Sequence, residues 1–189
     1  MSRPRNSSRS EWLNFDELLR QAGGFERLFK LAKASGVNLE EEVQRALRAD
    51  SALFRIVECR VSKVGKGVVE LSFPFSGTIT RRGGIVHGGV VMYAMDTVCG
   101  LAVMTVNHGT DQLTLELNVS FLEPLKKGPF VARGTVVRAG RATAVAEGEI
   151  RDAEGQLCAK SLGTYYLVGK KTSRRTQGLT QPLEGSAEA

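Results

Sequence analysis

One stretch of the sequence, Val90–Asn107, is apolar at almost every position and contains a single carboxylate, Asp96. At roughly 18 residues it reaches the length of a membrane-spanning helix. A carboxylate in the middle of a bilayer costs several kcal/mol, and the sequence offers Asp96 no evident partner. A helix that is apolar on all sides is better explained as the buried centre of a globular domain. The rest of the chain must therefore cover this helix.

Strand patterns occur on both sides of the predicted helix. Before it, alternating apolar residues predict a hairpin from Leu53 to Phe73 with its turn at Lys63–Gly67, and residues 74–84 are expected to form a loop. After it, four segments with strand patterns are joined by short turns: Leu115–Phe121, Phe130–Arg138, Ala142–Arg151 and Gln156–Val168. Short turns imply antiparallel neighbours. This order predicts an α+β fold in which one antiparallel sheet wraps around one long central helix.

The chain is expected to have three parts. Residues 1–50 form an N-terminal helical extension, because apolar residues recur at helical spacing over Trp12–Ala22 and Phe25–Ala32. Asn38 and Glu41 match a capping box for a third helix that ends near Asp50. Residues 51–168 hold the sheet and the central helix, and residues 169–189 are expected to be a flexible tail. The N-terminal helices suit an amphipathic cover over the sheet domain or over another subunit.

Composition narrows the class of protein. With 189 residues and 42% apolar side chains, the chain can bury the core of one domain with extensions. Cys59, Cys99 and Cys158 lie too far apart in sequence for a disulfide framework or a thiolate zinc cluster, so we expect a reducing compartment and no metal. The first ten residues hold three arginines and no apolar stretch. We therefore expect no secretory signal, a cytoplasmic location and no membrane partner.

The net charge of +6 is spread along the whole chain. Residues 1–50 carry 9 basic and 8 acidic groups (+1), residues 51–168 carry 13 and 10 (+3), and residues 169–189 carry 4 and 2 (+2). No segment is a basic arm, so we expect no nucleic-acid partner. A thin positive excess suits a small anionic ligand at least as well.

Asp96 is the sharpest chemical anomaly in the sequence. On a helix it shares a face with apolar or small residues, namely Met92, Tyr93, Gly100 and Val103. Burial among such groups raises the pKa of a carboxyl unless hydrogen bonds compensate, which suits a general base or a nucleophile. The structural alternative is an aspartate at a subunit interface, satisfied by backbone amides or by a hydroxyl such as that of Thr97. The residues alone leave both interpretations open.

His87, Gly88 and Gly89 come directly before the apolar stretch. Glycines that open a helix leave unpaired N–H groups, which with the helix dipole can hold an oxyanion. The alternatives are glycines needed only for a tight turn and a histidine that makes only structural hydrogen bonds. If the helix starts at Gly89, Asp96 lies two turns away, on the order of 10 Å. Amides and carboxylate acting on one bond must then come from different subunits, which predicts a homodimer with its active sites at the interface.

From about Leu53 to Val168 the sequence resembles the hotdog-fold acyl-CoA thioesterases, specifically the phenylacetic-acid-degradation type. Three segments carry the resemblance, in the order in which the family has them: Gly84–Val91 with Met95–Thr97, Thr114–Pro124, and Arg138–Arg141. The resemblance implies a hotdog fold, hydrolysis of an acyl-CoA thioester to a free acid and CoA, and no cofactor. It also implies a homodimer that pairs into a dimer of dimers.

The resemblance further implies a set of catalytic residues. Asp96 would be the base or nucleophile that attacks the thioester carbonyl, directly or through water. The backbone amide of Gly88, with that of Gly89 and beside His87, would polarise that carbonyl from the partner subunit. Thr114 stands where the family often has a hydroxyl that orients water.

The residues implied for CoA binding include one departure from the family. Gly140 and Arg141 would lie near the CoA phosphates, which a guanidinium can pair in bidentate fashion. The family often has an asparagine six residues before the histidine, and here that position is Arg81, followed by Arg82. The two arginines could select an anionic acyl group or contact phosphate, or backbone donors alone could hold the carbonyl. Glu123 stands where an arginine is often found, a second departure.

Three other functions are compatible with the fold. A transcription regulator that senses acyl-CoA would use Phe25–Leu47 as a helix-turn-helix, but its recognition helix would begin with Glu40–Glu42, which repel DNA phosphates. A hotdog dehydratase needs an acid–base pair, and the chain has only His87 and His108. A noncatalytic acyl-CoA binder would keep the fold without the chemistry.

Overall fold

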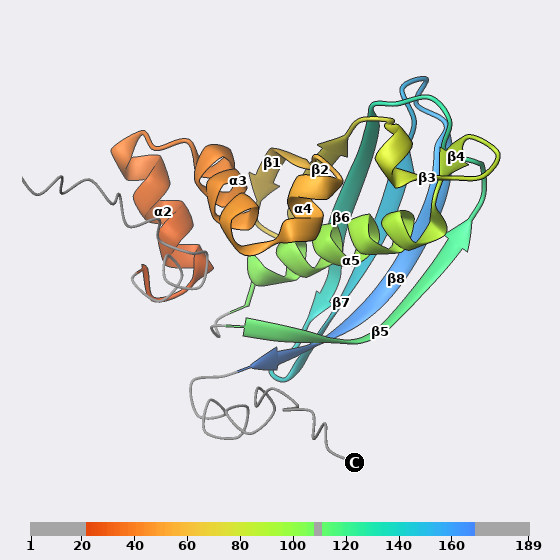
Figure 1. Ribbon diagram of the computed structural model, residues 1–189. Coiled ribbons are helices and arrows are strands. Elements are labelled where there is room, and N and C mark those ends of the chain that lie inside the picture. Colours follow the sequence, from red (N-terminus) through yellow and green to blue (C-terminus); the bar gives the residue numbers. More distant parts are fainter. Residues whose placement is uncertain (1–21, 108–110, 169–189) are drawn as a thin grey trace, which may run out of the picture.

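The computed structural model describes residues 22–107 and 111–168. Six strands form one antiparallel sheet in the order β1-β2-β6-β7-β8-β5, and β3 and β4 form a separate small hairpin (Figure 1). The strands are β1 Arg60–Gly65, β2 Val68–Phe73, β3 Thr80–Arg81, β4 Ile85–Val86, β5 Asp111–Phe121, β6 Phe130–Ala139, β7 Thr143–Arg151 and β8 Leu157–Val168. The four strands predicted after the central helix are confirmed, with β5 starting earlier than expected. The expectation that short turns join neighbouring strands holds for β6, β7 and β8 but is wrong for β5 and β6, because β5 pairs with β8 and β6 pairs with β2.

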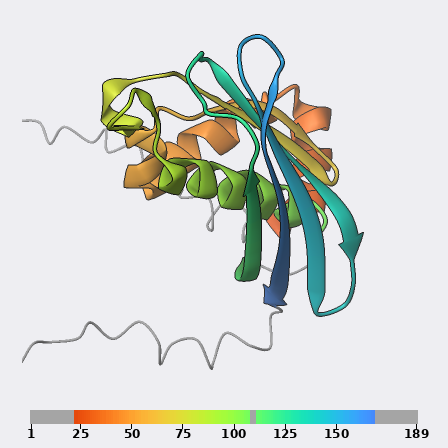
Figure 2. The same cartoon turned by 90° about the vertical axis from the view of Figure 1, so that its right-hand side faces the viewer.

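The long apolar segment is the central helix α5, Gly88–Met104, which lies along one face of the sheet (Figures 1 and 2). It packs against β2, β5, β6, β7 and β8. Ala94, Met95, Val98, Cys99 and Ala102 are fully enclosed. This arrangement is the antiparallel sheet around one long helix that the sequence predicts, and burial on all sides explains why the helix is apolar on all sides.

A row of small residues lets α5 approach the sheet closely. Gly134 of β6 pairs with Gly148 of β7, which pairs with Ser161 of β8. A methyl group on Gly134 would lie 2.4 Å from the Val98 carbonyl oxygen, and one on Gly148 would lie 2.9 Å from the Cys99 sulfur. Real Cβ atoms do not come that close, so larger residues in this row would push the helix off the sheet.

The segment before β1 corrects the sequence prediction of a strand beginning at Leu53. Residues 52–56 form the short helix α4, Ala52–Ile56, because Ser51 Oγ accepts a 3.1 Å hydrogen bond from the Phe54 amide and caps its start. Phe54 and Val57 are buried at helical i, i+3 spacing, whereas Leu53 is 53% exposed. The buried residues Phe54 and Val57 therefore follow the spacing of a helix and not the alternation of a strand.

Two smaller differences concern turns and loops. The first hairpin turns at Lys66 and Gly67, since β1 continues through Gly65, which pairs with Val68. The predicted loop over residues 74–84 contains a 3-10 turn, Gly77–Ile79, and the strand β3 of the small hairpin.

The N-terminal part contains two of the three predicted helices, α2 Phe25–Ser35 and α3 Leu39–Asp50. Asn38 caps α3 as predicted, because its side-chain oxygen accepts a hydrogen bond from the Glu41 amide at 3.3 Å. Residues 12–21 of the helix predicted over Trp12–Ala22 lie outside the described residues, as do the tail 169–189 and His108. Within the part of the chain that the structure describes, no helix combines the length and the apolarity needed to cross a bilayer.

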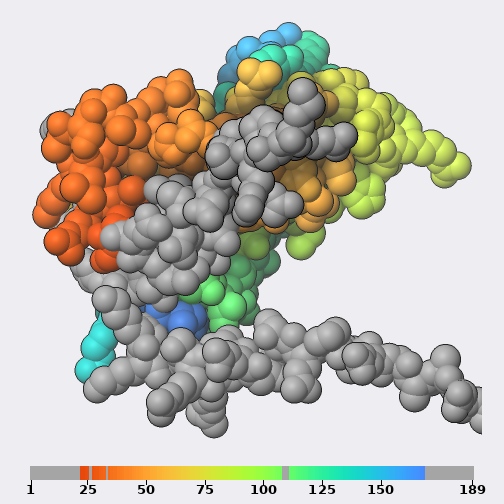
Figure 3. Space-filling model, turned by 60° about the vertical axis from the view of Figure 1, so that its left-hand side comes forward, coloured from red at the N-terminus to blue at the C-terminus, as the bar shows by residue number. Residues whose placement is uncertain are grey.

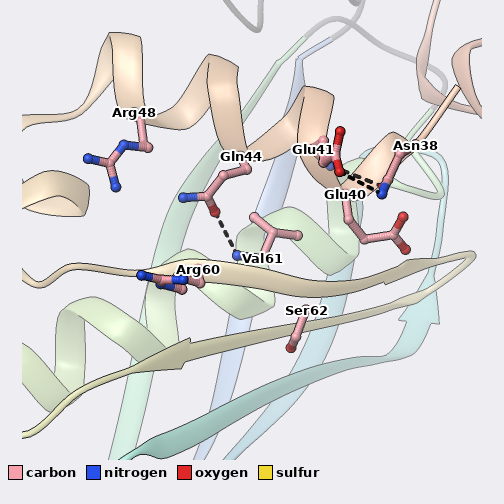
Figure 4. Close-up of a pocket in the computed structure, with 8 residues that line it drawn as sticks. All are labelled: Asn38, Glu40, Glu41, Gln44, Arg48, Arg60, Val61 and Ser62. Carbon is pink, nitrogen blue, oxygen red and sulfur yellow. Dashed lines mark hydrogen bonds between the residues drawn. The ribbon is translucent and has the colours of Figure 1, made fainter.

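Side chains of α3 cover the outer edge of β1. The side-chain oxygen of Gln44 accepts from the Val61 amide at 2.7 Å (Figure 4). The side-chain nitrogen of Gln44 donates to the Cys59 carbonyl at 3.1 Å, so that Gln44 bonds to the edge as a neighbouring strand would. Glu40 accepts from the Val64 amide at 3.0 Å. These bonds satisfy backbone groups that an edge strand otherwise leaves open to pairing with another chain.

A groove of about 580 Å³ lies between α3 and β1, beside these hydrogen bonds (Figure 4). All but one of its lining residues are polar or charged, and all come from these elements or from the residue before α3: Asn38, Glu40, Glu41, Gln44, Arg48, Arg60, Val61 and Ser62. Since no residue of α5 lines it, this groove is distinct from the candidate active site.

Candidate active site

Asp96 is held by two hydroxyl groups from the sheet. Thr114 Oγ1, on β5, donates to Asp96 Oδ1 at 2.9 Å, and the Tyr165 hydroxyl, on β8, donates to the same oxygen at 3.3 Å. Asp96 itself is half-buried. The hydroxyl suggested by the sequence, that of Thr97, lies on the same helix, whereas the observed donors come from the sheet. Asp96 Oδ1 is thus held by two donors, whereas Asp96 Oδ2 receives no hydrogen bond from the described residues.

Tyr165 was not predicted as a site residue. Its side chain is 1% exposed. Burial, and then the neighbouring Cys99 and Asp96, raise the pKa of Tyr165 above its ordinary value, so the hydroxyl stays protonated and acts as a donor. In the sequence, Tyr165 is one of several apolar and aromatic residues in a strand pattern, and only the pairing of strands brings it to Asp96.

His87 and Gly88 form the start of α5. The His87 Nδ1 accepts a 3.0 Å hydrogen bond from the Gly89 amide, and so His87 is the N-cap of the helix. The Gly89 N–H is therefore engaged inside the protein. The Gly88 N–H donates to none of the described residues, which leaves it as the better of the two predicted oxyanion donors.

The structure does not bring these amides and Asp96 together within one chain. Asp96 follows Gly88 by eight residues of one helix, which corresponds to about 12 Å along its axis. The two ends of β5 mark the two halves of the site. Thr114 near its start contacts Asp96, and Phe121 at its end lies against Gly88, 3.5 Å from where a Cβ would stand.

The predicted CoA-binding residues also lie at opposite ends of the sheet. Arg81 and Arg82 are exposed on the β3–β4 hairpin, which projects from the molecule in yellow-green in Figure 3 and joins directly to the start of α5. Gly140 and Arg141 are exposed in the β6–β7 turn. That turn leads into Thr143, which pairs with Tyr166 near the other end of the sheet.

The described residues contain no group of three or more histidine, cysteine, aspartate or glutamate side chains arranged to hold a metal ion. All three cysteines are buried and unpaired. Burial raises the pKa of the Cys99 thiol to about 11 and that of Cys59 to about 12. Buried thiols with raised pKa values are poor nucleophiles, which leaves Asp96 as the chemical group of this site.

An antiparallel sheet around one long helix, with glycines at the start of that helix and a hydroxyl-bound carboxylate in its middle, defines a hotdog domain suited to acyl transfer chemistry. The sequence profile of the thioesterase superfamily matches residues 83–159. A protein from Saccharolobus solfataricus, named as a candidate esterase, is 38% identical over 133 residues, which cover 70% of this chain and 95% of that protein. The chain belongs to the thioesterase superfamily.

Solved structures agree with this family. A thioesterase from Haemophilus influenzae superimposes with a TM-score of 0.64 at 26% identity, covering 70% of this chain and 92% of that one. The PaaI protein from the phenylacetic acid degradation operon of E. coli superimposes with a TM-score of 0.61 at 19% identity, over 66% of this chain and 89% of that one. The second likeness is one of fold alone.

The family match includes some of the site residues and excludes others. His87, Gly88, Asp96 and Thr114 fall inside the matched range 83–159. Arg81 and Arg82 fall before it, and Tyr165 falls after it. Thioester hydrolysis is thus the chemistry that the family supports.

Proposed function

We propose that the protein hydrolyses acyl-CoA thioesters to a free acid and CoA. The observation that carries the proposal is the arrangement at Asp96, a carboxylate on the central helix. Thr114 and Tyr165 hold one of its oxygens, and the other accepts no hydrogen bond from the part of the chain that the structure describes. Asp96 promotes attack on the thioester carbonyl, directly or through water, and the carbon–sulfur bond breaks to release the CoA thiol. One water molecule is consumed for each thioester.

The developing oxyanion is stabilised by the Gly88 amide of the partner subunit. This amide points out of the first turn of α5, where the helix dipole favours negative charge. The separation of about 12 Å along one helix supports assigning the two groups to different subunits. His87 acts by capping the helix and so keeping the Gly88 amide in place.

The dimer forms through the outer edge of β5. This is one edge strand of the sheet, and its large apolar residues Leu113, Leu115 and Phe121 are 47%, 60% and 55% exposed. The edge at β1 is instead covered by Gln44 and Glu40. A long uncovered edge with exposed apolar side chains favours pairing with a second copy.

Antiparallel pairing of two β5 strands around Asn118 completes the site. In this register Thr114 of one subunit approaches Phe121 of the partner subunit, because Thr114 stands four residues before Asn118 and Phe121 stands three residues after it. Thr114 contacts Asp96 and Phe121 lies against Gly88, so the carboxylate of one subunit would face the amide of the other. Such dimers could pair again into the tetramer that the resemblance implies.

Cross-linking tests the dimer. Asn118 is exposed, and residues facing across a two-fold axis in an antiparallel pair have Cα atoms about 5 Å apart, within disulfide range. An Asn118→Cys variant should form a disulfide-linked dimer under mild oxidation, because the native thiols are buried. Ser62→Cys, on the covered edge of β1, is the matched control and should stay monomeric on a non-reducing gel. Cross-linking of Ser62→Cys alone would contradict the proposed interface.

The arginines bind the CoA phosphates from two subunits. Arg141 lies at the Asp96 end of its own sheet, and Arg81 and Arg82 lie at the Gly88 end, which the partner subunit supplies to the same site. Replacing Arg81 and Arg82 by alanine should raise KM for acyl-CoA by about tenfold and leave kcat within about twofold. Lys63→Ala, on β1, should change neither constant. If KM rises only for acyl-CoAs whose acyl group carries a negative charge, the arginines bind the acyl group instead of the phosphates.

The activity is tested by release of free CoA thiol from a panel of short, long, aromatic and hydroxylated acyl-CoAs. Asp96→Asn keeps the shape of the side chain and removes its charge, so we expect at least a hundredfold lower kcat in a folded variant. Binding of acyl-CoA without thiol release from any member of the panel would overturn the proposal and favour a sensor or carrier. Hydration of an unsaturated acyl-CoA would favour the dehydratase.

A further inference from the structure

Tyr165 carries a buried hydroxyl that contacts the candidate catalytic carboxylate, and it lies beyond the residues that the family profile matches. It stands on β8, and its ring is enclosed between α5 and the sheet. Its hydroxyl donates to Asp96 Oδ1 at 3.3 Å, the same oxygen that accepts from Thr114 at 2.9 Å. The two donors approach from neighbouring strands, since Thr114 of β5 is the register partner of Tyr165.

A glycine of β8 makes room for this side chain, and a second glycine, on α5, lies at ordinary contact distance from it. A methyl group on Gly163 would lie 3.0 Å from both the Tyr165 hydroxyl and its ring, and one on Gly100 would lie 3.8 Å from the ring. Gly163 precedes Tyr165 by two residues on the same face of β8, and Gly100 stands one turn after Asp96 on α5. The Tyr165 ring therefore lies against Gly163, and its hydroxyl reaches Asp96.

We propose that Tyr165 is a positioning residue, which with Thr114 anchors Oδ1 of Asp96 so that Oδ2 is the oxygen presented to water or to the thioester. This inference rests on the proposed role of Asp96. A single donor leaves a carboxylate free to rotate about the bond to Cβ. Two donors from different directions on one oxygen fix the plane of the carboxylate, and no hydrogen bond from the described residues competes at Oδ2.

The proposal predicts an effect on proton affinity as well as on geometry. A hydrogen bond donated to a carboxylate stabilises its ionised form, so removing one makes the carboxylate easier to protonate. The other titratable groups near Asp96 are the Cys99 thiol on the same helix, whose pKa burial raises to about 11, and the Tyr165 hydroxyl itself. Glu147 on β7 is exposed and acts on Cys99. The two buried groups remain protonated over the range in which a carboxylate titrates.

Tyr165→Phe removes the hydroxyl and keeps the ring, and Tyr166→Phe removes the hydroxyl of the next residue, on the other face of β8, as the matched control. For Tyr165→Phe we expect kcat to fall by about tenfold with KM within twofold. We also expect the acidic limb of the pH profile of kcat/KM to move to higher pH, because the carboxylate loses a hydrogen-bond donor. Tyr166→Phe should match the wild type in both. Circular dichroism establishes that each variant is folded.

A carbon-13 NMR titration of the aspartate carboxyls tests the contact without relying on turnover, with the Asp96 signal assigned by its absence in Asp96→Asn. A higher titration midpoint for Asp96 in Tyr165→Phe than in the wild type supports the proposal. Equal midpoints and equal pH profiles in the two proteins would overturn it, even if the wild type is an active thioesterase. If the wild type releases no thiol from any acyl-CoA, the proposed function fails, and the NMR midpoints alone decide on Tyr165.

Discussion

Thr114 and Asp96 join the edge strand β5 to the central helix α5 through a 2.9 Å hydrogen bond between Oγ1 and Oδ1. The bond ties the proposed catalytic carboxylate to the strand through which the proposed dimer forms. A change in the pairing of β5 can therefore alter the orientation of Asp96 directly.

Two substitutions of Thr114 distinguish the effect of its hydroxyl group on turnover from the effect of its side-chain shape. Thr114→Val is nearly isosteric and loses the donor, so we expect kcat to fall by about tenfold, whereas Thr114→Ser keeps the donor and should stay within about threefold of the wild type. Steady-state thiol release measures both. Equal kcat values for the valine and serine variants would show that the hydroxyl has no part in turnover.

The row of small residues under α5 should be intolerant of a single methyl group. Gly134→Ala would set a Cβ 2.4 Å from the Val98 carbonyl oxygen, which is backbone and cannot move aside, so we expect a loss of about 3 kcal/mol or more in the free energy of unfolding. A Cβ on Gly148 would meet only side-chain atoms, those of Ser161, Cys99 and Met95, which can shift. Gly148→Ala should therefore lower the free energy of unfolding by about 1–3 kcal/mol. Gly77→Ala, with no heavy atom within 4 Å, is the control and should change stability by less than about 0.5 kcal/mol. Urea denaturation followed by circular dichroism gives the three values.

The covered edge of β1 should depend on Gln44. Gln44→Ala leaves the Val61 amide and the Cys59 carbonyl without their partner, and we expect a loss of about 1–3 kcal/mol in the free energy of unfolding. Arg45→Ala, the next residue of α3, removes only an exposed ion pair with Glu42 and should cost less than about 0.5 kcal/mol. Light scattering on the same samples should show self-association of Gln44→Ala alone, since an uncovered edge invites strand pairing. Equal free energies of unfolding for the two variants would show that Gln44 does not stabilise the edge of β1.

The two buried thiols, Cys59 and Cys99, should lower the free energy of unfolding at alkaline pH. Burial raises the pKa of Cys59 to about 12 and that of Cys99 to about 11, from an ordinary value of 9.0. Because the unfolded chain releases these protons first, their contribution to the free energy of unfolding is complete below about pH 8 and declines as the pH rises from about 9 towards 12. At pH 10 the loss is about 1 kcal/mol for each thiol. Urea midpoints at pH 7.5 and pH 10 measure it, and a Cys59→Ala, Cys99→Ala double variant should show a smaller decline.

Much of the fold follows from local patterns that tertiary contacts reinforce. The apolar segment after Gly89 predicted the central helix because a helix enclosed on every side has no position where a polar residue is favoured. The strands after it were predicted because their alternation and short turns agree with each other. The pattern misled before β1, where Ser51 caps a short helix and Phe54 and Val57 follow the period of that helix. It also misled at the short turn after β5, which leads into a strand that is not a neighbour of β5.

The sequence by itself determined the central helix and the antiparallel pairing of β6 with β7 and of β7 with β8, and it singled out Asp96 as an unusual carboxylate, because each of these is recorded in residue type and spacing along one segment. Tertiary structure alone decided that Tyr165 reaches Asp96 and that Gln44 covers the edge of β1. It also decided that the Gly89 amide is engaged by His87 while the Gly88 amide is not. These relationships join residues through the register of strands, the close approach of helix and sheet, and the direction of single side chains, and none of those is encoded in a local period.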